Sequence, residues 1–246
     1  MSRSLLTVAL LTAGCAGNDL PSGSYLDHDR ALGVRIEVDG DPSRASPNPG
    51  EVVTARWIVA GPDQTTNVAW TLGACIGHAT GCDGDPFAVE SGSSRDPQVS
   101  VAVPETGLLR IGGEIAGTNV MASVPIATGN RNPSLAAATL ALASSPWSEA
   151  DCIELSASGD NVELAMELPV DAREADDGAL QVSHFTTIGS FERQFSVLDG
   201  DATSLRVDWV PPEDGVSERR TAQIVIVLRD GRGGLDAITR QACIVP

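Results

Sequence analysis

The chain of 246 residues contains no lysine, and this absence excludes several kinds of chemistry. A Schiff-base lysine, a phosphate-loop lysine and a Ser-x-x-Lys nucleophile pair cannot exist in it. Aromatic residues are also scarce, at 4% of the sequence. Gly and Pro are plentiful, and most apolar residues are Val, Ala, Leu and Ile. This composition favours many short strands joined by turns over a bundle of helices.

Hydrolase signatures are missing as well. The sequence has neither a Gly-x-Ser-x-Gly nucleophile elbow nor a His-Glu-x-x-His zinc motif. Its three histidines, His28, His78 and His184, fall in a polar segment, a cysteine-containing loop and a predicted strand or loop. Acidic residues are abundant, but abundance alone does not pair two carboxylates as a glycosidase requires. We therefore expect no enzyme activity, no catalytic residue and no cofactor.

Positive charge is in short supply, because 16 arginines stand against 33 acidic residues and the formal net charge is −17. Such a surface would repel DNA and RNA, whose binding depends on basic side chains that neutralise phosphates. The only adjacent basic pair is Arg219 and Arg220. An acidic exterior helps to keep a protein soluble. The sequence therefore predicts no nucleic-acid partner.

The first residues have the pattern of an export signal. Arg3 supplies a positive charge, and Leu5–Leu11 forms a short apolar stretch. This stretch is far shorter than the roughly 20 residues that a helix needs to cross a bilayer. A charged start followed by a short apolar segment and small residues is typical of a secretory signal peptide.

The end of this signal, LTAGC at residues 11–15, resembles the lipobox of bacterial lipoproteins. The resemblance implies that residues 1–14 are cleaved off and that Cys15 carries lipid, which would anchor the chain in a membrane. Thr12 departs from the family pattern, where a bulky aliphatic residue is more usual. Ordinary cleavage nearby, which leaves Cys15 as a free thiol, is the alternative. Ala16 is not the aspartate that serves as a retention signal in enteric bacteria, and this favours the outer membrane.

The five cysteines fit this interpretation. An odd number in an exported protein leaves one thiol unpaired unless it has another role. If Cys15 carries lipid, then Cys75, Cys82, Cys152 and Cys243 form an even set in an oxidising compartment. Three pairings are possible, and Cys75 with Cys82 and Cys152 with Cys243 is favoured because each link lies within one predicted domain. The longer loop would contribute roughly 4–5 kcal/mol of stability.

After the signal, the sequence divides into a tether and two bodies. Residues 15–30 are polar, with Gly, Pro and Ser, and predict a flexible tether. Residues 31–128 contain at least six short stretches in which apolar and polar residues alternate, separated by Gly- and Pro-rich turns. Such a series predicts an antiparallel β-sandwich. The first stretch places four apolar residues on one side of a half-buried strand: Leu32, Val34, Ile36 and Val38.

The second body spans residues 129–246 and follows a linker, residues 127–133, in which Gly, Asn and Pro crowd together. It also contains alternating stretches, and Ile224–Leu228 is a continuous aliphatic run typical of a central strand buried on both faces. Ser134–Ala143 is the one stretch that favours a helix, and it fits a strand about as well. We therefore predict an all-β chain with two antiparallel immunoglobulin-like β-sandwich domains in tandem.

Several stretches are similar to surface proteins of bacteria. Pro49–Thr54 (PGEVVT) resembles the start of many bacterial immunoglobulin-like domains. Ile224–Ile244 resembles the last hairpin of immunoglobulin-like, PKD-like and cadherin-like repeats. The second body also resembles uncharacterised lipoproteins of myxobacteria and related bacteria, although His184 stands where a Trp is expected. The resemblance implies the fold and a surface location and transfers no catalytic residue. It rests on Asn132-Pro133, Val182–Phe191 and the terminal hairpin.

The stretch Leu228–Asp236 (LRDGRGGLD) has three glycines between two aspartates and raises the question of a ligand site. A phosphate site needs a strand, a Gly-rich turn and then a helix whose N–H groups face the anion. Here the residues after Gly234 suffice for about one strand, and the glycine spacing does not match the dinucleotide fingerprint. A β-hairpin turn with glycines at positive φ is therefore favoured. Asp230 and Asp236 remain candidates for calcium.

Calcium is the main alternative ligand, because aspartates two residues apart in a turn can share one ion. None of these turns extends to a full EF-hand loop, and Asp-Gly is also a common turn dipeptide. Cys75, His78 and Cys82 supply three possible zinc ligands, one fewer than a structural site needs, so a small disulfide is favoured there. The sequence therefore predicts no metal site. The aspartate pairs are Asp27 and Asp29, Asp39 and Asp41, Asp83 and Asp85, and Asp199 and Asp201.

These patterns together predict an exported protein of the cell envelope that acts as a non-catalytic binding or structural module, in surface display, adhesion or an envelope complex. Its expected partners are the membrane, through lipid on Cys15, and another envelope protein or a surface polysaccharide. The alternative function is a calcium-dependent carbohydrate-binding module. Trp57, Trp70 and Trp209 are expected in the cores of the sandwiches rather than on a sugar-stacking surface.

Overall fold

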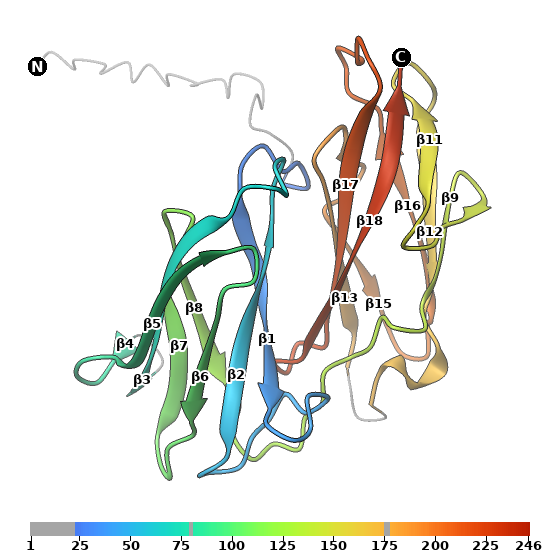
Figure 1. Ribbon diagram of the computed structural model, residues 1–246. Helices are drawn as coiled ribbons and strands as arrows, with labels where there is room; N and C mark the ends of the chain where they lie inside the picture. Colours follow the sequence, from blue (N-terminus) through green and yellow to red (C-terminus); the bar gives the residue numbers. More distant parts are fainter. Residues whose placement is uncertain (1–22, 79–80, 175–177) are drawn as a thin grey trace, which may run out of the picture.

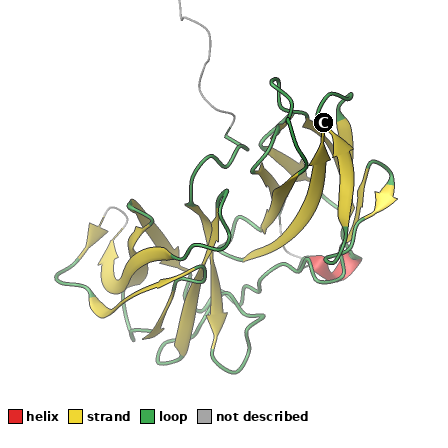
Figure 2. Ribbon diagram, turned by 45° about the horizontal axis from the view of Figure 1, so that its top comes forward, coloured by secondary structure: helices red, strands yellow, loops and turns green. Residues whose placement is uncertain are grey.

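The computed structural model describes residues 23–78, 81–174 and 178–246, which form two β-sandwiches lying side by side (Figure 1). Strands supply nearly all regular structure, and the one helical element in these ranges is a short 3-10 turn at Val170–Ala172 (Figure 2). No helix in the described part of the chain is long and apolar enough to cross a membrane. The fold is all-β, with two immunoglobulin-like sandwich domains in tandem, as the sequence predicts.

The first sandwich, domain 1, consists of two sheets that enclose one apolar core. Its smaller sheet contains β1 (Arg30–Val38), β2 (Val52–Ala60) and β6 (Gln98–Ala102), in that order. Its larger sheet contains β3 (Val68–His78), β4 (Gly81–Cys82), β5 (Phe87–Ser94), β7 (Leu108–Ile115) and β8 (Thr118–Val124). In this sheet β3 lies between β7 and the shorter partners β4 and β5, and β8 forms the far edge.

The second sandwich, domain 2, has two five-stranded sheets. One contains β9 (Thr139–Leu142), β10 (Ser145–Pro146), β12 (Val162–Glu167), β14 (Ser190–Phe191) and β16 (Ser204–Val210), in the order β10-β9-β12-β16-β14. The other contains β11 (Cys152–Ser156), β13 (Leu180–Thr186), β15 (Phe195–Leu198), β17 (Arg220–Arg229) and β18 (Leu235–Val245), in the order β11-β18-β17-β13-β15. β11 pairs with β18 in parallel, an exception to the antiparallel prediction that is possible because no hairpin joins these strands.

Tryptophans lie in both cores. Trp57 and Trp209 are buried in domains 1 and 2, and Trp70 is half-buried against the core of domain 1. Trp147, which the sequence did not single out, is also buried, and its Nε1–H donates to the carbonyl oxygen of Gln241 at 3.0 Å. The tryptophans named from the sequence therefore pack in the sandwiches as expected.

The aliphatic run Ile224–Leu228 forms the centre of β17, between β13 and β18. Every residue of the run is buried. The even-numbered residues belong to the core of domain 2, whereas Val225 and Val227 face domain 1. The prediction of a strand buried on both faces is therefore correct. One face is buried in the core of domain 2, and the other is covered by domain 1.

This contact between the domains has an apolar centre, which we call the interdomain core. Burial of apolar surface is the main force that holds two such bodies together. The outer face of the sheet around β17 is consequently covered by domain 1. Seven buried residues form the interdomain core: Leu26, Leu32, Ala60, Phe185, Val225, Val227 and Leu235.

β1 reaches the interdomain core through a β-bulge. The pairing of β1 with β2 shifts at Leu32, so the alternation predicted from the sequence holds only beyond this residue. Ile36 and Val38 are buried inside domain 1, whereas Leu32 is buried against domain 2. A Cβ at Gly33 would lie 2.5 Å from Leu235 Cδ1, so Leu235 would have to shift to make room for any side chain there. The bulge thus turns one apolar residue of the strand toward the other domain.

The segment before β1 packs on domain 2, which corrects part of the predicted tether. The backbone N–H of Thr186 donates to the Ser24 carbonyl at 2.8 Å, and the N–H of Leu26 donates to the Thr186 carbonyl at 2.8 Å. The segment therefore extends the β13 edge in parallel. Leu26 is completely buried in the interdomain core. Residues 23–30 are thus not a free tether, and residues 15–22 lie outside the described part of the chain.

The linker between the domains runs from the end of β8 at Val124 to the start of β9 at Thr139. The predicted boundary between residues 128 and 129 falls inside it. Ser134–Ala143, which fitted a helix or a strand, supplies β9. The linker and the turn between β17 and β18 lie at the same end of the molecule, the lower end in Figure 1.

Candidate functional site

Four of the five cysteines form two disulfides. The Cα–Cα distances are 5.6 Å for Cys75 and Cys82 and 5.3 Å for Cys152 and Cys243, the pairs that the sequence favours. The sulfur atoms of Cys75 and Cys82, the two cysteines of the possible zinc site, are thus bonded to each other and are not thiolate ligands. Cys15, the predicted lipidation site, and the side chain of His78 lie outside what the structure describes.

The glycine-rich stretch Leu228–Asp236 turns the chain from β17 into β18, and is therefore a hairpin turn rather than a phosphate site. Asp230 stabilises the turn, since its Oδ1 accepts hydrogen bonds from two backbone N–H groups, including that of Gly234 at 2.9 Å. Gly231 and Gly233 have φ angles of +74° and +107°, which favour glycine.

The same turn joins the two domains, a role that the sequence did not indicate. Asn130 of the linker donates from Nδ2 to Asp230 Oδ2 at 2.8 Å. Asn132 accepts at Oδ1 from the Leu235 N–H at 3.0 Å and donates from Nδ2 to the Ile36 carbonyl at 2.7 Å. One asparagine side chain therefore bridges a strand of each domain. We call this set of contacts the joint.

Asp236 belongs to the joint as well. Its Oδ2 accepts a hydrogen bond at 2.7 Å from a backbone N–H of the linker, and its Oδ1 pairs with Arg35 of β1. A Cβ at Gly234 would lie 2.7 Å from the carbonyl oxygen of Arg131, so the linker passes directly over the turn. Asp230 and Asp236, the calcium candidates of this turn, therefore bind protein donors. Close packing explains the glycine at position 234.

The other aspartate pairs are dispersed. Among the residues that the structure describes, no three or more His, Cys, Asp or Glu side chains are grouped so that they could hold a metal ion. Asp41 accepts a hydrogen bond from Ser43 Oγ at 2.5 Å, which holds the pKa of Asp41 below its usual value. Asp27 contacts the ring of His28 at 2.6 Å. No contact in these ranges favours the calcium-dependent alternative.

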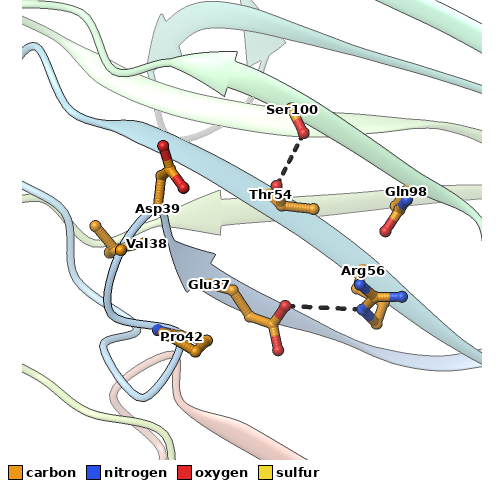
Figure 3. A pocket seen from close by; sticks show the side chains of 9 residues that line it. Glu37, Val38, Asp39, Pro42, Thr54, Arg56, Gln98 and Ser100 are labelled. Atoms are coloured by element: carbon orange, nitrogen blue, oxygen red, sulfur yellow. Dashed lines mark hydrogen bonds and ion pairs between the residues drawn. The ribbon is translucent and has the colours of Figure 1, made fainter.

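A polar trough of about 340 Å³ opens on the outer face of the smaller sheet of domain 1 (Figure 3). Successive side chains of a strand point to opposite faces, so these polar side chains lie opposite the core residues of the same strands. The turn after β1 closes one end of the trough. Its polar lining comes from three adjacent strands and this turn: Glu37, Asp39, Thr54, Arg56, Gln98 and Ser100.

Interactions across the strands hold the wall of the trough. Arg56 Nε lies 3.7 Å from Glu37 Oε2, and the same guanidinium pairs with Asp96 just before β6. Thr54 Oγ1 and Ser100 Oγ share a hydrogen bond of 2.8 Å. These contacts join β1, β2 and β6 from the outside, so the polar surface has a defined shape without a ligand.

The trough is connected to the joint through charged side chains. Arg35 Nε donates to Glu37 Oε1 at 2.9 Å, and the same arginine pairs with Asp236 of domain 2. Gln98 also lines the trough, but its Oε1 is buried and has no hydrogen-bond partner among the described residues. Carboxylate, guanidinium, amide and hydroxyl groups together suit a partner rich in both donors and acceptors.

Sequence reasoning missed this trough for a physical reason. Its residues are polar members of ordinary strand alternations, such as Glu37 in β1 or Ser100 in β6. Only the order β1-β2-β6 brings them together, and strand order depends on contacts between distant parts of the chain. The spacing of polar residues at i and i+2 in three strands is the one local signal.

His184, in β13, is a core residue rather than part of this surface. It is 0% exposed, its ring lies 5.5 Å from the ring of Phe191, and neither ring nitrogen has a hydrogen-bond partner in the described ranges. Burial lowers the pKa of His184 to about 4. The imidazole is therefore neutral at neutral pH and enclosed in domain 2, whereas the trough lies on domain 1.

Comparisons with known proteins place the chain in no family. No protein-family model matches it, and no curated protein matches it. The "D0-D1 domain of Intimin" is 13% identical, covers 87% of this chain and 100% of its own length, and has a TM-score of 0.28. The tandem V-type regions of VCBP3, a v-region-containing chitin binding protein, are 7% identical, cover 89% and 99%, and have a TM-score of 0.29. The fold assignment rests on the strand pairing described above.

Proposed function

We propose that this protein is a non-catalytic binding or structural module of the cell envelope, anchored by lipid on Cys15. The observation that carries the proposal is the pair of sandwiches held by the joint, with the polar trough left open on one of them. Such a body presents a shaped polar surface instead of a reactive centre. Disulfides in both domains support an exported location, because they persist in oxidising compartments.

The side chains at the trough support binding rather than catalysis. Glu37, Arg56 and Ser100 offer an acceptor, a donor and a hydroxyl, and no histidine of the described part of the chain lines the trough. General acid–base catalysis needs a titratable group in hydrogen-bond reach of the reacting atoms. The Glu37 carboxylate of the trough is instead engaged by two guanidinium groups, those of Arg35 and Arg56. His28 lies at the surface beside Asp27, and the ring of His184 is enclosed.

We take the partner to be polar, either a surface polysaccharide or a polar segment of another envelope protein. A photo-crosslinking residue at Ser100, inside the trough, should form a covalent adduct with this partner in native membranes. The same residue at Ser91, an exposed position on β5, is the matched control and should form none. Equal adducts from both positions, or none from Ser100, would contradict the trough as the binding site.

The lipid anchor is tested separately. Cys15→Ser should abolish incorporation of a labelled fatty acid and should move the protein from the membrane fraction to the soluble fraction. Ala16→Ser keeps the cysteine and should leave both properties unchanged. If Cys15→Ser remains labelled and membrane-bound, the anchor lies elsewhere.

A further inference from the structure

Strand β15 forms an open edge of domain 2. It pairs with β13 on one side, and on its other side it makes no backbone hydrogen bond within the described residues. The N–H of His184 donates to the Gln194 carbonyl at 2.9 Å, so the even-numbered residues here bond to β13. Phe195 and Val197 therefore direct their N–H and C=O groups away from the sheet.

The side chains of this edge are apolar and exposed. Phe195 is 51% exposed and Val197 is 49% exposed. They stand two residues apart and so lie on the same face of the sheet. Natural sheets protect such edges with charges, proline, bulges or a covering element, because an uncovered apolar edge pairs readily with another strand. The strand itself, Phe195–Leu198, contains no charge and no proline.

We propose that β15 pairs with β15 of a second copy of this chain, antiparallel and related by a two-fold axis at Ser196. The two five-stranded sheets would then form one ten-stranded sheet across the dimer. The outward N–H and C=O groups of Phe195 and Val197 supply the hydrogen bonds of the new pair. A two-fold, self-complementary contact of this kind is the commonest form of dimer interface.

The residues that flank the strand select the register. With the axis at Ser196, Phe195 faces the partner's Val197, and Arg193 faces the partner's Asp199. An axis at Phe195 would set Val197 against Arg193, and an axis at Val197 would set Phe195 against Asp199. Only the first register matches apolar with apolar residues and opposite charges with each other.

Charged residues flank the strand at both ends. Arg193 and Asp199 are both exposed, one just before the strand and one just after it. Arg193 Nε donates to Ser196 Oγ at 3.1 Å, and its guanidinium also donates to the carbonyl oxygen of Arg206. These bonds hold the guanidinium on the side of β16, so its pairing with the partner's Asp199 requires Arg193 to release them. The two-fold axis repeats the pairing of Arg193 with Asp199 at both ends.

A short edge suffices if both copies are tethered to one surface. Confinement raises the effective concentration of one copy around the other, so a weak contact becomes populated. This step rests on the proposed lipid anchor, whereas the pairing of the edges does not. The axis stands perpendicular to the joined sheet, so both copies of domain 1 lie on the same face of it.

Sedimentation of the full chain in mild detergent, over a wide range of concentration, tests the dimer. The wild-type chain should show a monomer–dimer equilibrium. Val197→Lys should weaken it at least about tenfold, because it places a charge opposite the partner's Phe195. Val89→Lys, at a valine that is 58% exposed on β5, is the control and should leave the equilibrium unchanged. A wild-type monomer at every concentration, or an unchanged dimer in Val197→Lys, overturns the proposal.

Val197→Pro separates pairing from folding. The N–H that proline removes points away from β13, so the bonds between β13 and β15 are kept while the partner strand loses a donor. Thermal unfolding should stay cooperative while dimerisation weakens. A folded Val197→Pro variant that dimerises like the wild type overturns the proposal.

Disulfide trapping tests the register. Directly opposed residues of a hydrogen-bonded antiparallel pair have Cα atoms about 5.5 Å apart, within disulfide range. Coexpressed Phe195→Cys and Val197→Cys chains should therefore give a mixed disulfide-linked dimer. Two copies of Phe195→Cys alone would face each other diagonally, beyond that range. Predominant crosslinking of either variant with itself contradicts an axis at Ser196.

Discussion

At the scale of single residues, His184 shows the sharpest conflict between a side chain and its surroundings. Its imidazole is completely buried against Phe191, and both ring nitrogens lack a hydrogen-bond partner among the described residues. A buried polar group without a partner costs stability. Burial also disfavours the charged form, so the folded protein resists protonation at this ring while the unfolded chain does not.

This difference predicts a pH-dependent stability. In the folded protein the pKa of His184 is lowered to about 4. As pH falls from about 6.5 to about 4, His184 is therefore protonated in the unfolded chain but stays neutral in the folded protein, and this difference favours unfolding. The free energy of unfolding should therefore decrease by about 3 kcal/mol across this window. His184→Phe should remove that decrease. Its free energy of unfolding, measured with urea, should therefore rise relative to that of the wild type as the pH is lowered.

The surface residue His28 supplies the control for this measurement. His28→Gln changes an exposed ring and leaves His184 in place, so this variant should still lose stability between about pH 6.5 and about pH 4. The same loss of stability between neutral and acidic pH in His184→Phe and in the wild type would show that other groups cause it.

At the scale of elements, local signals predicted the strands well. The alternation of Val34, Ile36 and Val38 lies in β1, and the glycine-rich turn predicted the hairpin of β17 and β18. Leu32 continues such an alternation, but the bulge turns it to the other domain. Leu26 stands alone in a polar segment, and its burial depends on β13, far along the chain. Neither the alternation of apolar residues nor the residues of the turns can show that these two leucines are buried between the domains.

The two disulfides predict unequal effects on stability. Cys152–Cys243 links residues 91 positions apart, whereas Cys75–Cys82 links residues 7 apart. In the chain-entropy model the longer loop contributes roughly 4–5 kcal/mol and the shorter one roughly 2–3 kcal/mol. Replacing both cysteines of a pair by alanine should therefore lower the unfolding temperature more for the Cys152–Cys243 pair. Equal losses in calorimetry would argue against this loop-length effect.

The segment before β1 should behave as part of domain 2. Leu26→Ala empties a fully buried position and should lower the free energy of unfolding by about 3 kcal/mol. His28→Ala, two residues further on and exposed, should have almost no effect. Denaturant unfolding measures both variants, and a Leu26→Ala variant as stable as the wild type would mean that the segment does not dock.

At the scale of the whole molecule, the joint and the interdomain core relate the two sandwiches to each other. Asn132 and Asp236 make polar contacts between the domains, and Leu32 and Leu235 belong to the interdomain core. The sequence predicted two domains and a linker between them. It could not predict that the domains pack side by side, because none of these contacts is local. The sequence could not predict the trough for the same reason, because its residues meet only through strand pairing between distant parts of the chain.

Gly33→Val tests the packing of the domains. A Cβ at Gly33 would lie 2.5 Å from Leu235 Cδ1, so valine should displace the Leu235 side chain and loosen the contact between the domains. Small-angle scattering should report a larger radius of gyration, while circular dichroism keeps its β signal. Gly178→Val, at a glycine whose Cβ would meet nothing within 4 Å, should scatter like the wild type. Identical scattering from both variants would show that Gly33 does not set the spacing.

Because Gly23–Leu26 packs on β13, a force applied to the N-terminus acts first on domain 2. Eight peptide units separate Cys15 from Gly23 and span at most about 28 Å. A lipid on Cys15 would therefore keep the contact between the domains near the membrane. Tension applied through that lipid would enter the sheet of domain 2 before it reaches β1. The hydrogen bonds of Ser24 and Leu26 with Thr186 would then carry this load before any strand of domain 1 does.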